Sequence, residues 1–339
     1  MTFDDAANIG LSRIYAEMRR QTDDARQSLE NAGDVTAEIV ASVRRTGRLR
    51  LLGMGGSHCV NRTAEAVLRG YGHDAVAVVA SEALYAPFPD KAPVTRLLTS
   101  QSGESVEIAR ILDGDDLDDT FGLTLDANGR LARTVPSLIG HGGAEIAFAA
   151  TRSLTISLAL MAAVAEALGH SQDGVRTVLE TSSAVSTEAA MATLKDCDGV
   201  IFCARGALIG IAEAGALGLL ELARMPAFAL EGGQFRHGPI EALRPGMGVV
   251  FLRADDETTE LFSGLAGICA EAGAAPVMFD ASGRKPLDGC VTLQFPAAAG
   301  FAAALATLPC LQALLIAIAK TRVENVGEPI RSQKVTRSE

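Results

Sequence analysis

Two short loops rich in glycine and small hydroxyl side chains carry the clearest potential for chemistry in this sequence. The first occupies residues 55–57 (GGS) and the second residues 99–105 (TSQSGES). Each follows a short apolar run and precedes a helical pattern, so free N–H groups at the start of a helix would face a bound anion. The pattern indicates a phosphate site. Taken alone, the first loop could also be only a tight turn at Gly55-Gly56, and the second only a helix cap at Ser102.

The apolar runs and helical patterns around these loops alternate along the chain. We expect strands at 49–54, 75–80, 96–100, 121–126, 144–150, 199–204, 228–233, 247–254, 275–281 and 290–295. Longer helical patterns cover 4–32, 35–46, 153–168 and 301–319. This alternation is typical of a parallel sheet with helices on both faces, in which ligands bind beyond the carboxyl ends of the strands.

The same order of elements recurs after an offset of roughly 150 residues, which indicates an internal repeat. The predicted fold class is α/β, with two tandem domains that are each a doubly wound, flavodoxin-like parallel sheet flanked by helices. The expected parts are an N-terminal helical segment (1–34), a first domain (35–170), a second domain (185–325) and a tail that reaches the active site (326–339).

The amino-acid composition indicates which binding partners and which cellular compartment to expect. The 339 residues carry 30 basic and 41 acidic side chains, a net charge of −11, which argues against nucleic acid or an anionic membrane as partner. The six scattered cysteines predict free thiols in a reducing compartment and no metal site. The first ten residues lack the apolar core of a signal peptide, so we expect a cytoplasmic protein. The apolar segment 301–319 is expected to be a buried helix rather than a membrane span.

Six segments, taken together and in order, resemble the SIS (sugar isomerase) family, and within it the two-domain isomerase half of glucosamine-6-phosphate synthase. The segments are GMGGSH (53–58), ASEALY (80–85), TSQSGES (99–105), AEIAFAATRSLT (144–155), LEGGQFRHGPIEAL (230–243) and NVGEPIRSQKVTRSE (325–339). The similarity covers nearly the whole chain, and it implies two tandem SIS domains.

The resemblance also implies a role for particular residues. Glu221 would transfer the proton between C1 and C2 of the sugar, His237 would open the sugar ring from the neighbouring subunit of a homodimer, and Lys334 would form an imine. The 6-phosphosugar itself would be bound by Gly55, Gly56, Ser57, Ser100, Gln101, Ser102, Ser105 and Ala150. No metal and no organic cofactor is implied.

The residues themselves are compatible with these roles and with plainer ones. Glu221 lies between two leucines of an apolar helix, where partial burial would raise its pKa toward that of a useful base, or it is a surface residue paired with Arg224. His237 precedes a Gly-Pro turn and is either an acid–base group near neutral pH or simply exposed. Lys334 is either a reacting amine or part of a frayed tail.

Departures from the family decide between activities. Gly218 and Ala214 stand where the family has a lysine and a glutamate, and Ala150 replaces a serine. Because no glutaminase half is found in the chain, we expect no synthesis of ammonia from glutamine. The predicted reaction is therefore conversion of glucosamine 6-phosphate to fructose 6-phosphate and ammonia. The alternatives are a fructosamine 6-phosphate deglycase, with Gly218 leaving room for a bulkier amine, and a phosphosugar sensor without turnover.

Overall fold

The computed structural model describes residues 8–88, 92–114, 116–181 and 184–336. The chain divides into two compact units. The N-terminal unit comprises Arg13–Glu180 together with Pro329–Glu339, and the C-terminal unit comprises Met1–Ser12 together with Thr181–Glu328. The first seven residues, on which the prediction of no signal peptide depends, lie outside the described ranges.

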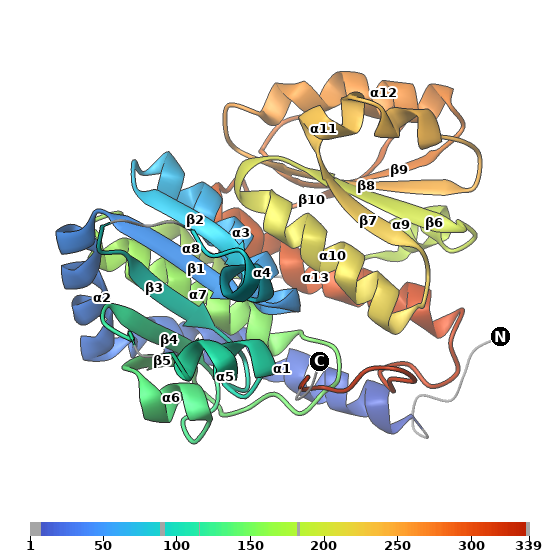
Figure 1. The fold of residues 1–339 in the computed structure, drawn as a ribbon. Helices are drawn as coiled ribbons and strands as arrows, with labels where there is room; N and C mark the ends of the chain where they lie inside the picture. Colours follow the sequence, from blue (N-terminus) through green and yellow to red (C-terminus); the bar gives the residue numbers. More distant parts are fainter. Residues whose placement is uncertain (1–7, 89–91, 115, 182–183, 337–339) are drawn as a thin grey trace. The chain divides into compact units, whose positions relative to one another are not determined.

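A five-stranded parallel sheet, in the order β2-β1-β3-β4-β5, is the centre of the N-terminal unit. Its strands are β1 (Arg48–Gly53), β2 (Asp74–Val79), β3 (Thr95–Thr99), β4 (Thr120–Thr124) and β5 (Ser137–Ile139). Its helices are α1 (Ile9–Glu30), α2 (Gly33–Thr46), α3 (Gly55–Gly70), α4 (Ala80–Tyr85), α5 (Val106–Leu112), α6 (Arg130–Thr134), α7 (Arg152–Ala167) and α8 (Asp173–Thr181). Helices flank both faces of this sheet (Figure 1), which explains why β4 is buried along its whole length.

The C-terminal unit is built around a second five-stranded parallel sheet, in the order β10-β9-β8-β6-β7. Its strands are β6 (Gly199–Ala204), β7 (Ala227–Glu231), β8 (Met247–Ala254), β9 (Ala275–Ala281) and β10 (Val291–Gln294). Its helices are α9 (Glu188–Leu194), η1 (Gly206–Leu208), α10 (Ile209–Leu222), α11 (Gly232–Arg236), η2 (Pro239–Ala242), η3 (Thr259–Phe262), α12 (Ser263–Glu271) and α13 (Gly300–Lys320).

The two sheets have the same strand order when each is numbered from its own first strand, namely 2-1-3-4-5. The predicted fold class, two tandem α/β units with parallel sheets flanked by helices, is therefore confirmed. The predicted domain ranges stay predictions, and the compact units differ from them at several boundaries. Most of α1 belongs to the N-terminal unit, and so does the end of the tail from Pro329.

The strand expected at 144–150 is wrong. This segment lies in the loop before α7, and the fifth strand is Ser137–Ile139, three residues long. The loop is fixed by contacts that a local pattern does not encode, such as the bond from the Ile146 N–H to Glu17 Oε1 at 2.9 Å. The alternating apolar residues of this segment therefore belong to a loop that is held by distant contacts, and they do not form a strand.

Helix α13 is long and apolar enough to cross a membrane by length and composition, but 78% of its most apolar window is buried within the structure. Phe301, Leu311 and Leu314 are almost completely inaccessible to solvent. The expectation of a buried helix at 301–319 is confirmed, and a core helix of this kind is only weak evidence for a membrane span.

Candidate functional site

The two glycine- and serine-rich loops occupy the carboxyl ends of the neighbouring strands β1 and β3. Gly55 begins α3 with a φ of 48°, a left-handed conformation that favours glycine. Ser57 lies in the first turn of α3. Because both loops leave the same edge of the sheet, the fold places them where parallel-sheet proteins bind ligands.

The loop after β3 has a tightly determined shape. Gly103 has a φ of 66°, and a Cβ atom there would lie 3.0 Å from Cβ of Leu131. Ser100 Oγ accepts a hydrogen bond from the Gly103 N–H at 3.2 Å, and Ser102 Oγ accepts one from the Glu104 N–H at 3.2 Å. Each hydroxyl therefore keeps its own proton for another acceptor, such as a phosphoryl oxygen.

Ser105, rather than Ser102, is the residue that precedes α5, and within the described residues its side chain makes no capping bond to that helix. The alternative interpretation of Ser102 as the helix cap is therefore wrong. The first helical N–H group, of Val106, donates to the carbonyl oxygen of Thr336 at 3.0 Å. The C-terminal tail thus lies directly against the start of α5.

Lys334 is fixed by this tail in the N-terminal unit. Its Nζ donates to Glu145 Oε2 at 3.0 Å and to the carbonyl oxygen of Phe148 at 3.4 Å, while 24% of the side chain remains exposed. The alternative of a frayed tail does not describe the structure at this residue. Gln101 Nε2 in turn donates to the Glu145 carbonyl oxygen at 3.4 Å, so Glu145 links the serine-rich loop to Lys334.

Glu145 was not recognised from the sequence, although it stands in the AEIAFAATRSLT segment. Its side chain is completely buried beside the start of α7. Burial by itself raises the pKa of a carboxyl group, but the Lys334 ammonium and the hydrogen bonds from Ser153 and Thr151 outweigh it, so the pKa of Glu145 lies below its ordinary value. The pair is therefore a buried carboxylate facing a partly exposed ammonium.

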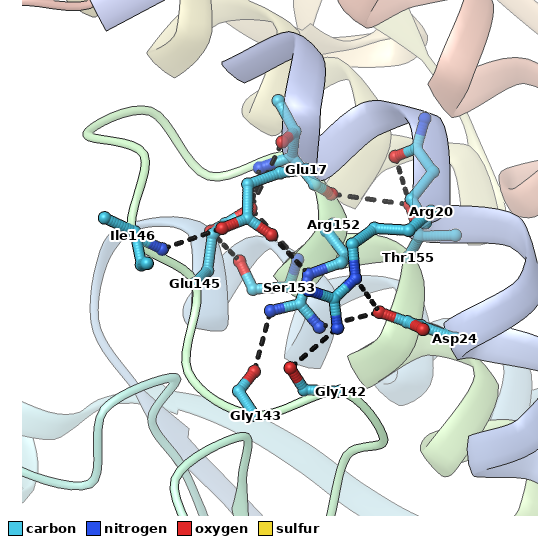
Figure 2. Close-up of polar contacts among 12 residues, drawn as sticks. Glu17, Arg20, Asp24, Gly142, Gly143, Glu145, Ile146, Arg152, Ser153 and Thr155 are labelled. Atoms are coloured by element: carbon cyan, nitrogen blue, oxygen red, sulfur yellow. Dashed lines mark hydrogen bonds and ion pairs between the residues drawn. The ribbon is translucent and has the colours of Figure 1, made fainter. Parts of the chain in front are cut away.

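A second buried ion cluster holds the loop that carries Glu145 (Figure 2). Arg152, which is 0% exposed, donates from Nε to Glu17 Oε2 at 2.6 Å and from Nη1 to Asp24 Oδ2 at 3.0 Å. Its Nη2 group also donates to the Gly143 carbonyl oxygen at 2.7 Å. Helix α1 is thereby tied to both ends of the 143–152 loop.

Glu221 and His237 belong to the C-terminal unit. Glu221 lies in the last turn of α10 and is partly buried, while His237 directly follows α11 and is exposed. Arg224, the suggested partner of Glu221, donates to the Glu328 carbonyl oxygen at 2.9 Å. Among the predicted site residues, the structure thus brings together the serine-rich loop and Lys334 within the N-terminal unit.

Gly218 has a packing explanation. A Cβ atom at this position would lie 2.8 Å from Leu315 Cδ1, and one at Gly215 would lie 2.8 Å from the Phe202 ring. Helices α10 and α13 approach closely along this glycine-rich face. The lysine that the family has at this position would therefore require Leu315 to move.

Within the described part of the chain, no group of three or more His, Cys, Asp or Glu side chains is arranged to hold a metal ion. All six cysteines are free, as predicted, and five of them are buried. Burial raises the pKa of the Cys203 and Cys269 thiols to about 12. These cysteines are therefore packing residues rather than nucleophiles at neutral pH.

A protein-family model described as SIS domain matches residues 193–317 of this chain. The glutamine–fructose-6-phosphate aminotransferase (isomerizing) of Pyrobaculum aerophilum is 27% identical over 248 residues, which are 66% of this chain and 40% of that protein. The chain thus spans less than half the length of the first curated relatives that it matches.

Solved structures extend the match to both units. The C-terminal domain of glucosamine-fructose-6-phosphate aminotransferase from Francisella tularensis has a TM-score of 0.80 at 19% identity, covering 94% of this chain and 98% of that one. Glucosamine-6-phosphate deaminase from Thermotoga maritima has a TM-score of 0.73 at 20% identity, covering 95% and 99%. The chain therefore contains a SIS domain and is related to the isomerase region of the aminotransferases, and the resemblance noted from the sequence is confirmed.

Proposed function

We propose that this protein is a phosphosugar isomerase-type enzyme that converts glucosamine 6-phosphate and water into fructose 6-phosphate and ammonia. The observation that carries the proposal is that one compact unit holds both the hydroxyl-lined loop at 100–105 and a lysine fixed on a buried carboxylate. A dianion and a carbonyl group are the two ends of an open-chain 6-phosphosugar, and these two features suit them. The relatives named for aminotransfer and deamination of such sugars support the same chemistry.

The phosphate end would supply binding energy and orientation. In the proposal, Ser57, Ser100, Ser102 and Ser105 donate to the phosphoryl oxygens, and Gln101 fixes the position of the loop through its bond to Glu145. Binding energy gained at C6, remote from the reacting carbons, is then available to hold C1 and C2 in the reactive geometry.

The carbonyl end would carry the chemistry. His237, contributed by the partner subunit of a homodimer, opens the sugar ring. Glu221 removes the proton from C2 and returns it to C1, while one proton of the amino group passes to the C1 oxygen. The 2-amino aldose is thereby converted into a ketose imine. Water then adds to that imine and ammonia leaves, while Lys334 can hold the open-chain carbonyl as an imine of its own.

The test is an assay of ammonia and fructose 6-phosphate released from glucosamine 6-phosphate. We expect turnover by the wild type and a loss of about 10²–10⁴-fold in kcat for Glu221→Gln, since proton transfer by a positioned group contributes on that order. Glu271→Gln, an exposed residue on α12, is the matched control and should retain wild-type activity. An inactive wild type or a fully active Glu221→Gln would overturn the proposal.

The deglycase alternative depended on free space beside Gly218. Because Leu315 occupies the position next to this glycine, that reason for a bulkier leaving amine is removed. A panel that includes fructoselysine 6-phosphate separates the two activities directly, and we expect glucosamine 6-phosphate to be the better substrate. A sensor would bind glucosamine 6-phosphate without exchanging deuterium at C2.

A further inference from the structure

The carboxylate of Glu145 is surrounded by hydrogen-bond donors on both oxygens. Oε1 accepts from the Thr151 N–H (2.9 Å), the Thr151 hydroxyl (3.1 Å) and the Ser153 N–H (3.3 Å). Oε2 accepts from the Ser153 hydroxyl (2.7 Å) and from Lys334 Nζ (3.0 Å). Four of the five donors come from the start of α7, so the carboxylate is held in place independently of the tail.

A purely structural role for this carboxylate would be to satisfy the first N–H groups of α7. The bonds from Thr151 and Ser153 already fulfil that role through Oε1. Oε2 accepts from the Ser153 hydroxyl and also from Lys334 of the tail, and 24% of the Lys334 side chain remains exposed. A lysine that is held by a buried carboxylate and is still partly open to solvent can react with a molecule that arrives from solvent.

We infer that Glu145 is the positioning residue of Lys334, aiming its amine and exchanging a proton with it when the amine reacts with a sugar carbonyl. This inference rests on the proposed function for its substrate. In the reaction, the ammonium gives one proton to the Glu145 carboxylate, and the Nζ lone pair forms a bond to the carbonyl carbon. The carbonyl oxygen, after taking up the Glu145 proton and the second nitrogen proton, leaves as water, and a protonated imine remains beside the Glu145 carboxylate.

The surroundings of Glu145 make this exchange reasonable. The facing groups from the tail and from α7 are Lys334, Thr151 and Ser153, while the neighbouring charges Arg152 and Glu17 are bound to each other. Once the amine has become neutral, burial is the main remaining influence and favours the protonated carboxyl group. The same carboxylate can thus hold an ammonium at rest and accept its proton during the reaction.

The experiment compares Glu145→Gln with Ser153→Ala, which removes a hydrogen bond to the same oxygen and leaves the Glu145 carboxylate bonded to Lys334. With glucosamine 6-phosphate, we expect Glu145→Gln to lower kcat about 10²-fold or more with little change in KM, since the phosphate contacts remain. Borohydride should trap less sugar on Lys334 in this variant than in the wild type, as measured by mass spectrometry. Ser153→Ala should lower the melting temperature while keeping kcat within about threefold.

A substrate-independent measurement separates this inference from the proposed function. Acetic anhydride labelling of Lys334 is compared with labelling of Lys195 and Lys285, which are exposed references in the same digest. Without the negative charge, Lys334 should label about tenfold faster relative to the references in Glu145→Gln, and at the wild-type ratio in Ser153→Ala. An unchanged ratio in a folded Glu145→Gln protein, or equal kcat losses in both variants, overturns the inference. A wild type without turnover overturns the proposed function, and the labelling ratio still decides whether Glu145 controls the amine.

Discussion

The two units share a strand order but differ in what stands at the ends of equivalent strands. Gly55 after β1 and Gly206 after β6 both have a left-handed conformation, with φ values of 48° and 54°. After β3 the chain continues as Ser-Gln-Ser-Gly-Glu-Ser, whereas after β8 it continues as Asp255-Asp256-Glu257. The repeat has therefore preserved a glycine turn after the first strand of each sheet and changed the charge of the loop after the third strand.

This difference in charge supports the proposal that the anion binds in the N-terminal unit. At the β8 end, Asp256 Oδ1 accepts from the Thr258 N–H at 2.8 Å and from its hydroxyl at 2.6 Å, so the loop is organised around its own carboxylate. The nearby cation, Arg205, is bound to Glu231 at 2.6 Å. Three acids would repel a phosphate dianion there, while Glu104, the acid of the equivalent loop, accepts the Arg130 N–H at 2.6 Å. The fold supplies two similar loop positions, and side-chain chemistry selects one.

The segments that precede α7 and α13 differ in the same way. Arg152 at the start of α7 is held by buried carboxylates, whereas the corresponding start of α13 buries Phe301. Arg152→Leu should therefore destabilise the N-terminal unit by about 3–5 kcal/mol, because Glu17 would stay buried without this cation and Asp24 would keep only the half-exposed Arg20, 2.8 Å away. Phe301→Leu should cost only about 1–2 kcal/mol. Hydrogen exchange of peptides from α1 and α13 measures both, and equal losses of protection would contradict the contrast.

Placing an acid in the N-terminal loop tests the assignment of the anion. Ser102→Asp should weaken glucosamine 6-phosphate binding by about 10²-fold, since a like charge beside a phosphate costs several kcal/mol before the loop and solvent adjust. Asp256→Ser, the reverse change in the C-terminal unit, should leave the dissociation constant within about twofold. Calorimetric titration of both variants measures the effect. Stronger dependence on Asp256 than on Ser102 would reverse the assignment.

The two units also differ in how well their strands could be predicted from the sequence. Strands 199–204, 247–254 and 275–281 agree with the structure residue by residue, because fully buried parallel strands appear as continuous apolar runs. The sequence did not predict β5, because a strand of three residues leaves almost no hydrophobic pattern. Residues 144–150 were predicted as a strand because the polar side chains that hold this loop lie far away in the sequence. The bond from Arg152 to Glu17 spans 135 residues.

The site was predictable to a similar degree. Local motifs identified the serine-rich loop and the lysine, since each is a cluster of residue types with a known physical use. Glu145 was missed because its partner Lys334 is 189 residues away and its burial depends on the fold. The signal that could have indicated it is a single carboxylate inside an otherwise apolar segment, a combination that requires a partner.

Removing that partner gives the smallest of the expected effects, and its size depends on pH. In the wild type the pKa of Glu145 lies below its ordinary value of 4.5, so its stabilising contribution is present above that pH and is lost as the pH falls through the lowered pKa. In Lys334→Met the cation is absent, so burial raises the pKa of Glu145 instead. The carboxyl group is then destabilising at every pH where it must ionise.

The Lys334→Met variant should therefore be less stable by about 1–3 kcal/mol at neutral pH, since four hydrogen bonds to Glu145 remain. This difference should shrink as the pH falls through the raised pKa of the variant toward 4.5, where its buried carboxyl group becomes neutral. It should close below about 4.5, as the wild-type carboxylate is protonated as well. Thermal unfolding across that range measures it, with the exposed Lys285→Met as control, and a difference that widens toward acid pH would show that Glu145 does not depend on Lys334 for its charge.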